Sequence, residues 1–258
     1  MRSFPGISCE INDEEKLLLS HIDDMRKSCE RDYSPKFSRF LDERQAMLAE
    51  MLLRGSGFGT YRFFGGCEGA VRKMLCVYPE YCEPEDGDFP IKTLLFGYRR
   101  QDKPTHSQFL GTIMSCMIER SMVGDIVVDE GRTWVFVCDN AADAVSMIEK
   151  VGHVGVKVSF AEGADVEIKT EFEEFTASVS SLRLDCVASA AIKLSRDKTS
   201  AFIRSEGIDV NHRKIYAPDF NLSEGDVFSV RGRGKFVLDS IGGRSRRDRL
   251  FVTLKKYK

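Results

Sequence analysis

Residues 183–207 read RLDCVASAAIKLSRDKTSAFIRSEG, and this stretch decides the fold of the C-terminal part of the chain. Its first half places apolar residues at the i, i+3, i+4, i+7, i+8 positions of an amphipathic helix, namely Leu184, Val187, Ala188, Ala191 and Ile192. The pattern breaks at Leu194, and Ser195 is a suitable N-cap for a second helix, which ends near Gly207. The stretch therefore predicts two short consecutive helices.

Strand-like segments follow these helices up to the C-terminus. They cover residues 208–210, 227–231, 236–241 and 249–254, and Gly-, Asn- and Asp-containing turns separate them. Two short helices packed on a small antiparallel sheet account for the whole C-terminal region.

The basic residues of this region suggest a polyanionic ligand. Arg196 and Lys198 lie in the first turn of the second helix, where cations oppose the helix dipole at a cost of a few tenths of a kcal/mol each. A phosphate would instead meet free N–H groups and two cations there. The candidate RNA-binding residues are Arg183, Lys193, Ser195, Arg196, Lys198, Asn211, Arg213, Lys214, Arg231, Arg233 and Lys235.

The charge distribution agrees with a ligand at one end only. Residues 183–258 contain 17 basic and 9 acidic residues, whereas residues 1–182 contain 21 basic and 31 acidic residues. The net charge of −2 hides this division. A basic domain docked on its own acidic partner would show the same asymmetry, so charge alone leaves both interpretations open.

The middle of the chain has the element order strand, helix, strand, strand, helix, strand. The expected strands are 91–98, 125–129, 133–138 and 154–160, and the expected helices are 107–121 and 140–151. This order is typical of a ferredoxin-like fold, which RNA-recognition modules share. The aromatic residues Phe96, Tyr98, Trp134 and Phe136 could stack on bases, but the basic Gly-aromatic signature of such modules is missing, which favours a core role.

The N-terminal part is predicted to be mainly helical. Helices are expected at 12–32, from Ser34 to Arg54 with Pro35 in the first turn, and at 68–77, with a strand at 60–64. The glycine-rich segment 55–59 follows a helix and precedes a strand, which is the reverse of a nucleotide-binding loop, and is interpreted as a helix end.

The predicted fold class is α+β with three domains. We expect an N-terminal α/β domain at 1–83, a ferredoxin-like domain at 84–176 and the basic two-helix domain at 182–258; the acidic, turn-rich stretch 79–90 suggests the first boundary.

Several classes of protein are disfavoured. Eight cysteines are scattered without a CxxC pair and four histidines are dispersed, so no metal site is expected. No apolar run is long enough to span a membrane and no signal peptide is evident, so a cytoplasmic location is expected. No nucleophile–base or carboxylate pair stands out, so neither catalytic residues nor a cofactor are assigned.

The C-terminal region resembles the S4 RNA-binding domain. The matching residues are Arg183-Leu184-Asp185, Ser195-Arg196, Val210-Asn211, Gly225-Asp226 and Arg231-Gly232-Arg233-Gly234. Thr199 departs from the pattern because a small Ala is usual there, and Glu206 precedes a glycine shifted to position 207. The resemblance implies that Arg183, Ser195, Arg196 and Lys198 form the main RNA-contact patch.

The rest of the chain resembles the YlmH group of bacterial S4 proteins. The matching stretches are 37–44, 65–66, 68–72, 106–111, 118–120 and 123–126. This resemblance implies binding of rRNA or tRNA on the large ribosomal subunit, a role in rescue or quality control of stalled ribosomes, and a neighbourhood link to cell-division genes.

Two other functions stay open from the sequence. One is an RNA-modifying enzyme, of pseudouridine synthase or methyltransferase type, that uses the S4 domain for substrate delivery. The Arg183-Leu184-Asp185 triplet does not supply a synthase aspartate, because it begins a helix of the basic domain. The other is a scaffold that contacts proteins through its acidic N-terminal part, which is compatible with RNA binding.

Overall fold

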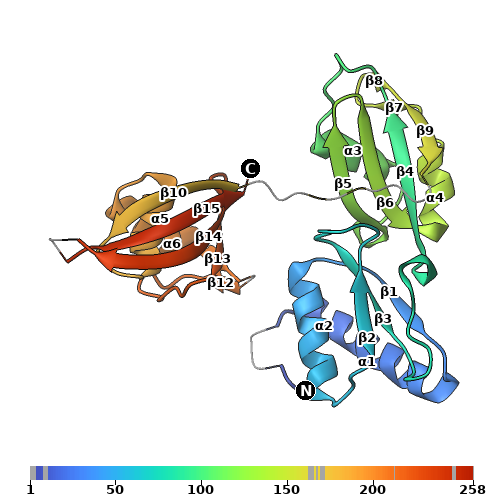
Figure 1. Cartoon of the computed structure of the whole chain (residues 1–258), viewed down its shortest axis with the longest axis horizontal. Helices are drawn as coiled ribbons and strands as arrows, with labels where there is room; N and C mark the ends of the chain where they lie inside the picture. The colour runs from blue at the N-terminus through green and yellow to red at the C-terminus, as the bar shows by residue number, and fades with distance from the viewer. Residues whose placement is uncertain are drawn as a thin grey trace. The chain divides into compact units, whose positions relative to one another are not determined.

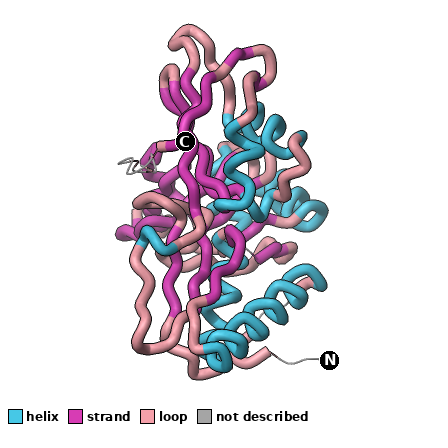
Figure 2. The backbone as a smooth tube through the Cα atoms, turned by 90° about the vertical axis from the view of Figure 1, so that its right-hand side faces the viewer, coloured by secondary structure: helices cyan, strands magenta, loops and turns pink. Residues whose placement is uncertain are grey.

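The computed structural model describes residues 4–7, 11–161, 166, 168, 172–211, 213–245 and 248–257. The chain divides into two compact units, Met1–Ile168 and Lys169–Lys258. Helices and strands are mixed in both, so the fold class is α+β, as predicted (Figures 1 and 2). No helix in the described residues combines the length and apolar character needed to cross a bilayer.

The first unit begins with two helices that pack against a three-stranded sheet. The helices are α1 (Asp13–Asp32) and α2 (Glu43–Gly55). The sheet has the order β1-β3-β2, with strands β1 (Lys36–Leu41), β2 (Tyr61–Phe64) and β3 (Lys73–Val77). Leu19, Leu48 and Leu75 belong to the buried cluster that joins the helices to the sheet.

Two helix predictions in this region are wrong. Residues 36–41 form strand β1, and α2 begins only at Glu43, where the Asp42 side chain caps the helix by accepting from the N–H of Gln45. Residues 73–77 form β3, the central strand, in place of the second half of the helix expected at 68–77. A continuous apolar run such as Met74–Val77 suits a strand buried on both faces as well as a helix.

The glycine-rich segment 55–59 is confirmed as a helix end. Helix α2 stops at Gly55, Gly57 has a φ of +74°, and β2 follows at Tyr61. The reversed order of elements excludes a phosphate-binding loop at this position.

The second half of the first unit has the predicted order of elements. They are β4 (Ile91–Gly97), α3 (His106–Ser115), β5 (Val123–Asp129), β6 (Arg132–Cys138), α4 (Asp139–Ser146) and β9 (Lys157–Phe160). The four strands form an antiparallel sheet in the order β5-β6-β4-β9. Short helical turns at Asp86–Asp88 (η1) and Arg120–Met122 (η2) and a two-stranded ribbon of β7 (Lys150–Val151) and β8 (Val154–Gly155) complete the unit.

The second unit contains two helices and one six-stranded sheet. The helices are α5 (Leu184–Ile192) and α6 (Arg196–Glu206). The strands are β10 (Phe172–Val179), β11 (Ile208–Val210), β12 (Arg213–Ile215), β13 (Val227–Val230), β14 (Gly234–Arg244) and β15 (Leu250–Tyr257). Their order is β10-β15-β14-β13-β11-β12, and every neighbouring pair is antiparallel.

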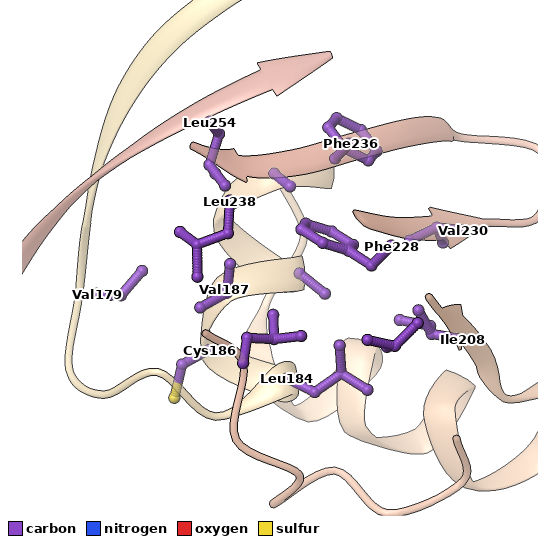
Figure 3. Packing of buried hydrophobic residues seen from close by; sticks show 14 of the residues in the cluster. Val179, Leu184, Cys186, Val187, Ile208, Phe228, Val230, Phe236, Leu238 and Leu254 are labelled. Atoms are coloured by element: carbon purple, nitrogen blue, oxygen red, sulfur yellow. The ribbon is translucent and has the colours of Figure 1, made fainter. Parts of the chain in front are cut away.

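Strand β10 lies at one edge of this sheet, whereas its residues 172–176 were expected in the middle domain. It pairs with β15 from Phe172↔Tyr257 to Val179↔Leu250 and therefore belongs to the C-terminal unit, although the expected middle domain extended to residue 176. The α5 side chains Leu184 and Val187 share one core with Phe228 and Leu238 of the sheet (Figure 3). The predicted periodicity of the 183–192 helix thus identifies its buried face.

Candidate nucleic-acid interface

The first turn of α5 is attached to the loop that precedes β13. The N–H of Leu184 donates to the Phe220 carbonyl at 2.7 Å, and the N–H of Asp185 donates to the Pro218 carbonyl at 3.0 Å. Arg183, the N-cap residue of α5, forms an isolated β-bridge with Asn221. The first N–H groups of a helix have no acceptor within the helix, and this loop supplies acceptors for two of them. The loop also fixes the position of Arg183.

Asp185 brings two of the predicted RNA-binding arginines together. Its side chain is only 2% exposed. Arg183 donates from Nε and Nη2 to the two carboxylate oxygens, each at 3.2 Å, and Arg196 donates from Nε at 3.0 Å. The Ser200 hydroxyl, one turn further along α6 than Arg196, donates at 3.2 Å. A single buried carboxylate therefore positions side chains from both helices.

The electrostatics keep this carboxylate charged. Burial by itself raises the pKa of Asp185. The hydrogen bonds from Arg183 and Arg196 have the larger combined effect in the opposite direction, so the pKa lies below the ordinary value of 3.8. One negative charge is shared by two guanidinium groups, which leaves one positive charge in excess. The side chains of Arg183 and Arg196 are 39% and 48% exposed, so part of each guanidinium remains accessible to a ligand.

The start of α6 lies beside this pair. Ser195 is the N-cap residue, as predicted, but its hydroxyl makes no capping hydrogen bond. Lys198 is exposed in the first turn. In the part of the chain that the structure describes, the terminal amino groups of Arg196 have no partner, since its contact with Asp185 uses Nε. Free donors and positive charge thus gather at a helix N-terminus, an arrangement that suits phosphate.

A second group of predicted residues meets at the other end of α5. Lys193 is the C-cap residue with a φ of 55°, and it lines a cavity of about 480 Å³ together with Arg233. Arg231, Arg233 and Lys235 line a neighbouring cavity of about 560 Å³. Both cavities are also lined by Lys256, which is not among the predicted RNA-binding residues.

The remaining predicted residues have more local roles. Asn211 adopts a φ of 47°, its Nδ2 donates to Asp226 at 2.7 Å, and its Oδ1 accepts from the N–H of Val227 at 2.9 Å. Both ends of its amide are therefore used to hold a turn. Arg213 and Lys214 are exposed on β12, at the edge of the sheet, and no described contact joins them to the other two groups.

The four aromatic residues considered for base stacking lie in a hydrophobic core or pack against one. Phe96 and Phe136 are buried, as the core interpretation predicts; Phe96 packs edge-on against Phe109, and Phe136 belongs to a cluster with Phe40 and Met74. Trp134 is half-buried, and the Arg132 guanidinium lies 4.6 Å from its ring centroid. The sheet face that carries Phe136 is thus covered in part by the N-terminal segment.

Comparison with known proteins points to one group. Residues 84–165 match the family model described as "Putative RNA-binding domain in YlmH". The chain is 29% identical over 250 residues to the ribosome-associated protein quality control protein P2 of Bacillus subtilis, covering 95% of this chain and 96% of that protein. The resemblance to YlmH is confirmed.

A solved structure agrees with this result. The cell division protein ylmH from Streptococcus pneumoniae matches with a TM-score of 0.51 and 26% identity, over 60% of this chain and 96% of that one. The YlmH family model covers β4 to β9 in the first unit. The two cation groups described above lie outside it, in the C-terminal unit.

Proposed function

We propose that this chain binds structured RNA on the ribosome, with the arginine pair at the helix starts of the C-terminal unit as its main contact. The observation that carries the proposal is the convergence of Arg183 and Arg196 on the buried Asp185. The names of the matches, a ribosome-associated quality control protein and an RNA-binding domain, support RNA binding on the ribosome, although the matched domain lies in the first unit and not at the arginine pair.

The finer proposal follows the S4 resemblance. The C-terminal unit acts as an S4-type domain that binds rRNA or tRNA on the large subunit, and the protein takes part in the rescue or quality control of stalled ribosomes. The helix pair on an antiparallel sheet supports this assignment. The first unit is proposed to hold an N-terminal domain, residues 1–83, and a ferredoxin-like domain that begins at residue 84; the order β5-β6-β4-β9 supports the latter.

The arrangement of the arginine pair suits binding to a sugar–phosphate backbone without catalysis. The guanidinium groups are oriented before the ligand arrives, so little side-chain entropy is lost on binding. Phosphate oxygens would accept from the accessible amino groups of Arg183 and Arg196, while Lys198 adds charge at the positive end of α6. The affinity is expected to fall steeply with salt as counterions are released. We propose that the protein acts by binding and not as an RNA-modifying enzyme.

The double substitution Arg183→Ala and Arg196→Ala tests this proposal. We expect the variant to lose co-sedimentation with purified large ribosomal subunits, because both oriented cations are removed. The matched control is Arg31→Ala with Arg54→Ala, which removes two exposed, ion-paired arginines that lie outside the matched residues 84–165 and should leave co-sedimentation unchanged. Circular dichroism checks that both variants are folded. A folded Arg183→Ala/Arg196→Ala variant that sediments like the wild type would contradict the proposal.

A further inference from the structure

Basic side chains without acidic partners surround the C-terminal end of α5. Lys193, Arg233 and Lys256 line the cavity of about 480 Å³, and Arg231, Arg233 and Lys256 line the one of about 560 Å³. The two cavities share Glu173, Arg233 and Lys256 as lining residues, so they adjoin. Glu173 is the one acidic residue among the described residues that line them.

Several other cations of the same unit have partners. Lys255 lies 2.6 Å from an oxygen of Asp239, Arg244 lies 2.6 Å from one of Asp248, and Arg249 donates to the Ser178 hydroxyl at 2.8 Å. Within the described residues, the side chains of Lys193, Arg233 and Lys256 make no hydrogen bond or ion pair. Unpaired like charges gathered in a concave site create a positive potential that attracts an anion.

The backbone around the cavities leaves room for a ligand and for Lys256. Gly232 has a φ of +71°, and a Cβ atom added there would meet nothing within 4 Å. A Cβ atom added to Gly234 would lie 3.1 Å from Cε of Lys256. Glycine at position 234 therefore allows the Lys256 side chain to cross strand β14 toward the Arg231–Gly234 turn. Apolar side chains also line the first cavity, among them Phe175, Ile192 and Phe236.

We propose that these cavities form a second anchor for RNA, in which Lys193, Arg233 and Lys256 hold backbone phosphates. This inference rests on the proposed RNA-binding function and adds a site to it. The first anchor is the pair Arg183 and Arg196 together with Lys198. Arg183 is the N-cap residue of α5 and Lys193 its C-cap residue, and the nine-residue helix between them is roughly 13 Å long at 1.5 Å per residue, so Arg183 and Lys193 contact different phosphates of the bound RNA.

Two adjacent lysines of β15 provide the test. Lys256 lines both cavities, whereas Lys255 points to the other side of the strand, where it pairs with Asp239. The affinity of Lys256→Ala and Lys255→Ala would be measured by filter binding to ribosomal RNA purified from large subunits, over a range of salt concentrations. We expect Lys256→Ala to weaken binding about 3- to 10-fold and to reduce the slope of log affinity against log salt by about one, with little change for Lys255→Ala.

A triple variant tests whether the remaining cations of the second anchor compensate for the loss of Lys256. Lys193→Ala, Arg233→Ala and Lys256→Ala together should reduce the slope by about two to three if each cation binds a phosphate. If the wild type binds and both the triple variant and Lys256→Ala behave like Lys255→Ala, the second anchor is wrong and the first stands. If the wild type itself binds neither ribosomal RNA nor tRNA in this assay, the proposed function fails, and the second anchor with it. Thermal melting checks that each variant is folded.

Discussion

Two pairs of arginines, one in each unit, show how the same side chain serves different ends. In the first unit, Arg72 donates from Nε to the Val123 carbonyl at 3.0 Å and from Nη2 to the Phe40 carbonyl at 3.2 Å, and Arg120 also donates to Val123. In the second unit, Arg183 and Arg196 share one buried carboxylate and remain partly exposed.

The partners explain the difference. Main-chain carbonyls belong to the fold, so Arg72 connects β1, η2 and β5, and its side chain is half-buried. Burial, with the Arg72 charge nearby, lowers the pKa of Arg120 to about 10, which leaves Arg120 charged at neutral pH. A carboxylate instead orients the guanidinium from one side and leaves its outer donors free. Arg72 and Arg120 lie in segments that resemble the YlmH group, and Arg183 and Arg196 in segments that resemble the S4 domain, so resemblance alone does not separate a structural arginine from one proposed to bind a ligand.

The largest expected effect is on the stability of the first unit. Arg72→Ala leaves the carbonyls of Phe40, Val123 and Arg120 without this donor, and we expect a loss of about 2–3 kcal/mol in the free energy of unfolding. Trp134 is the single tryptophan of the chain and lies in this unit, so its fluorescence in a urea titration reports the transition.

Two other arginine variants complete this test. Arg99→Ala removes an exposed surface arginine of the same unit and should change the transition by less than about 0.5 kcal/mol. Arg183→Ala lies in the other unit and should not move the Trp134 transition. An Arg72→Ala transition that coincides with that of Arg99→Ala would remove the distinction drawn between the two arginine pairs.

The sequence predicts helices α1, α5 and α6 but not strands β1 and β3, and the reason is the kind of information each requires. The 183–207 stretch carries local signals: an amphipathic period, a capping residue and a terminal glycine. The identity of β3 depends on pairing with β2 and with β1, which is distant in sequence, and its apolar run has no alternation that would mark it as a strand.

The same limit applies to the candidate site. The basic residues are visible in the sequence, but the role of Asp185 depends on how α6 packs beside α5. Lys256 is next to Lys255, and strand alternation predicts only that the two face opposite sides. Which of them faces Arg233 is decided by the register of β15 with β10 and β14, a non-local property.

A smaller effect is expected when the shared carboxylate is neutralised. Asp185→Asn adds one unit of net positive charge, so attraction to RNA at long range should increase. We nevertheless expect the affinity for ribosomal RNA to fall about 3- to 10-fold, because Arg183 and Arg196 lose the ion pairs that orient them. Filter binding at fixed salt measures the change, and thermal melting checks the fold.

Asp239→Asn is the matched control for this charge change. It makes the same change in net charge in the same unit, at a carboxylate that pairs with Lys255 and does not contact the arginine pair. Its affinity should stay equal to that of the wild type or rise slightly. If Asp185→Asn also binds as tightly as Asp239→Asn, charge and not orientation determines binding at this site.

The smallest effect on stability is expected at Ser195. Removal of an N-cap hydroxyl usually costs about 0.5–2 kcal/mol, but the Ser195 hydroxyl makes no capping hydrogen bond. Ser195→Ala should therefore change the free energy of unfolding of the C-terminal unit by less than about 0.5 kcal/mol, measured by circular dichroism in urea. A hydroxyl that the fold leaves unused is available to a phosphate, so the same substitution should weaken RNA binding by a small but measurable factor of about 2 to 5. The opposite pattern, lower stability with unchanged affinity, would make Ser195 an ordinary helix cap and would confine the first anchor to the two arginines and Lys198.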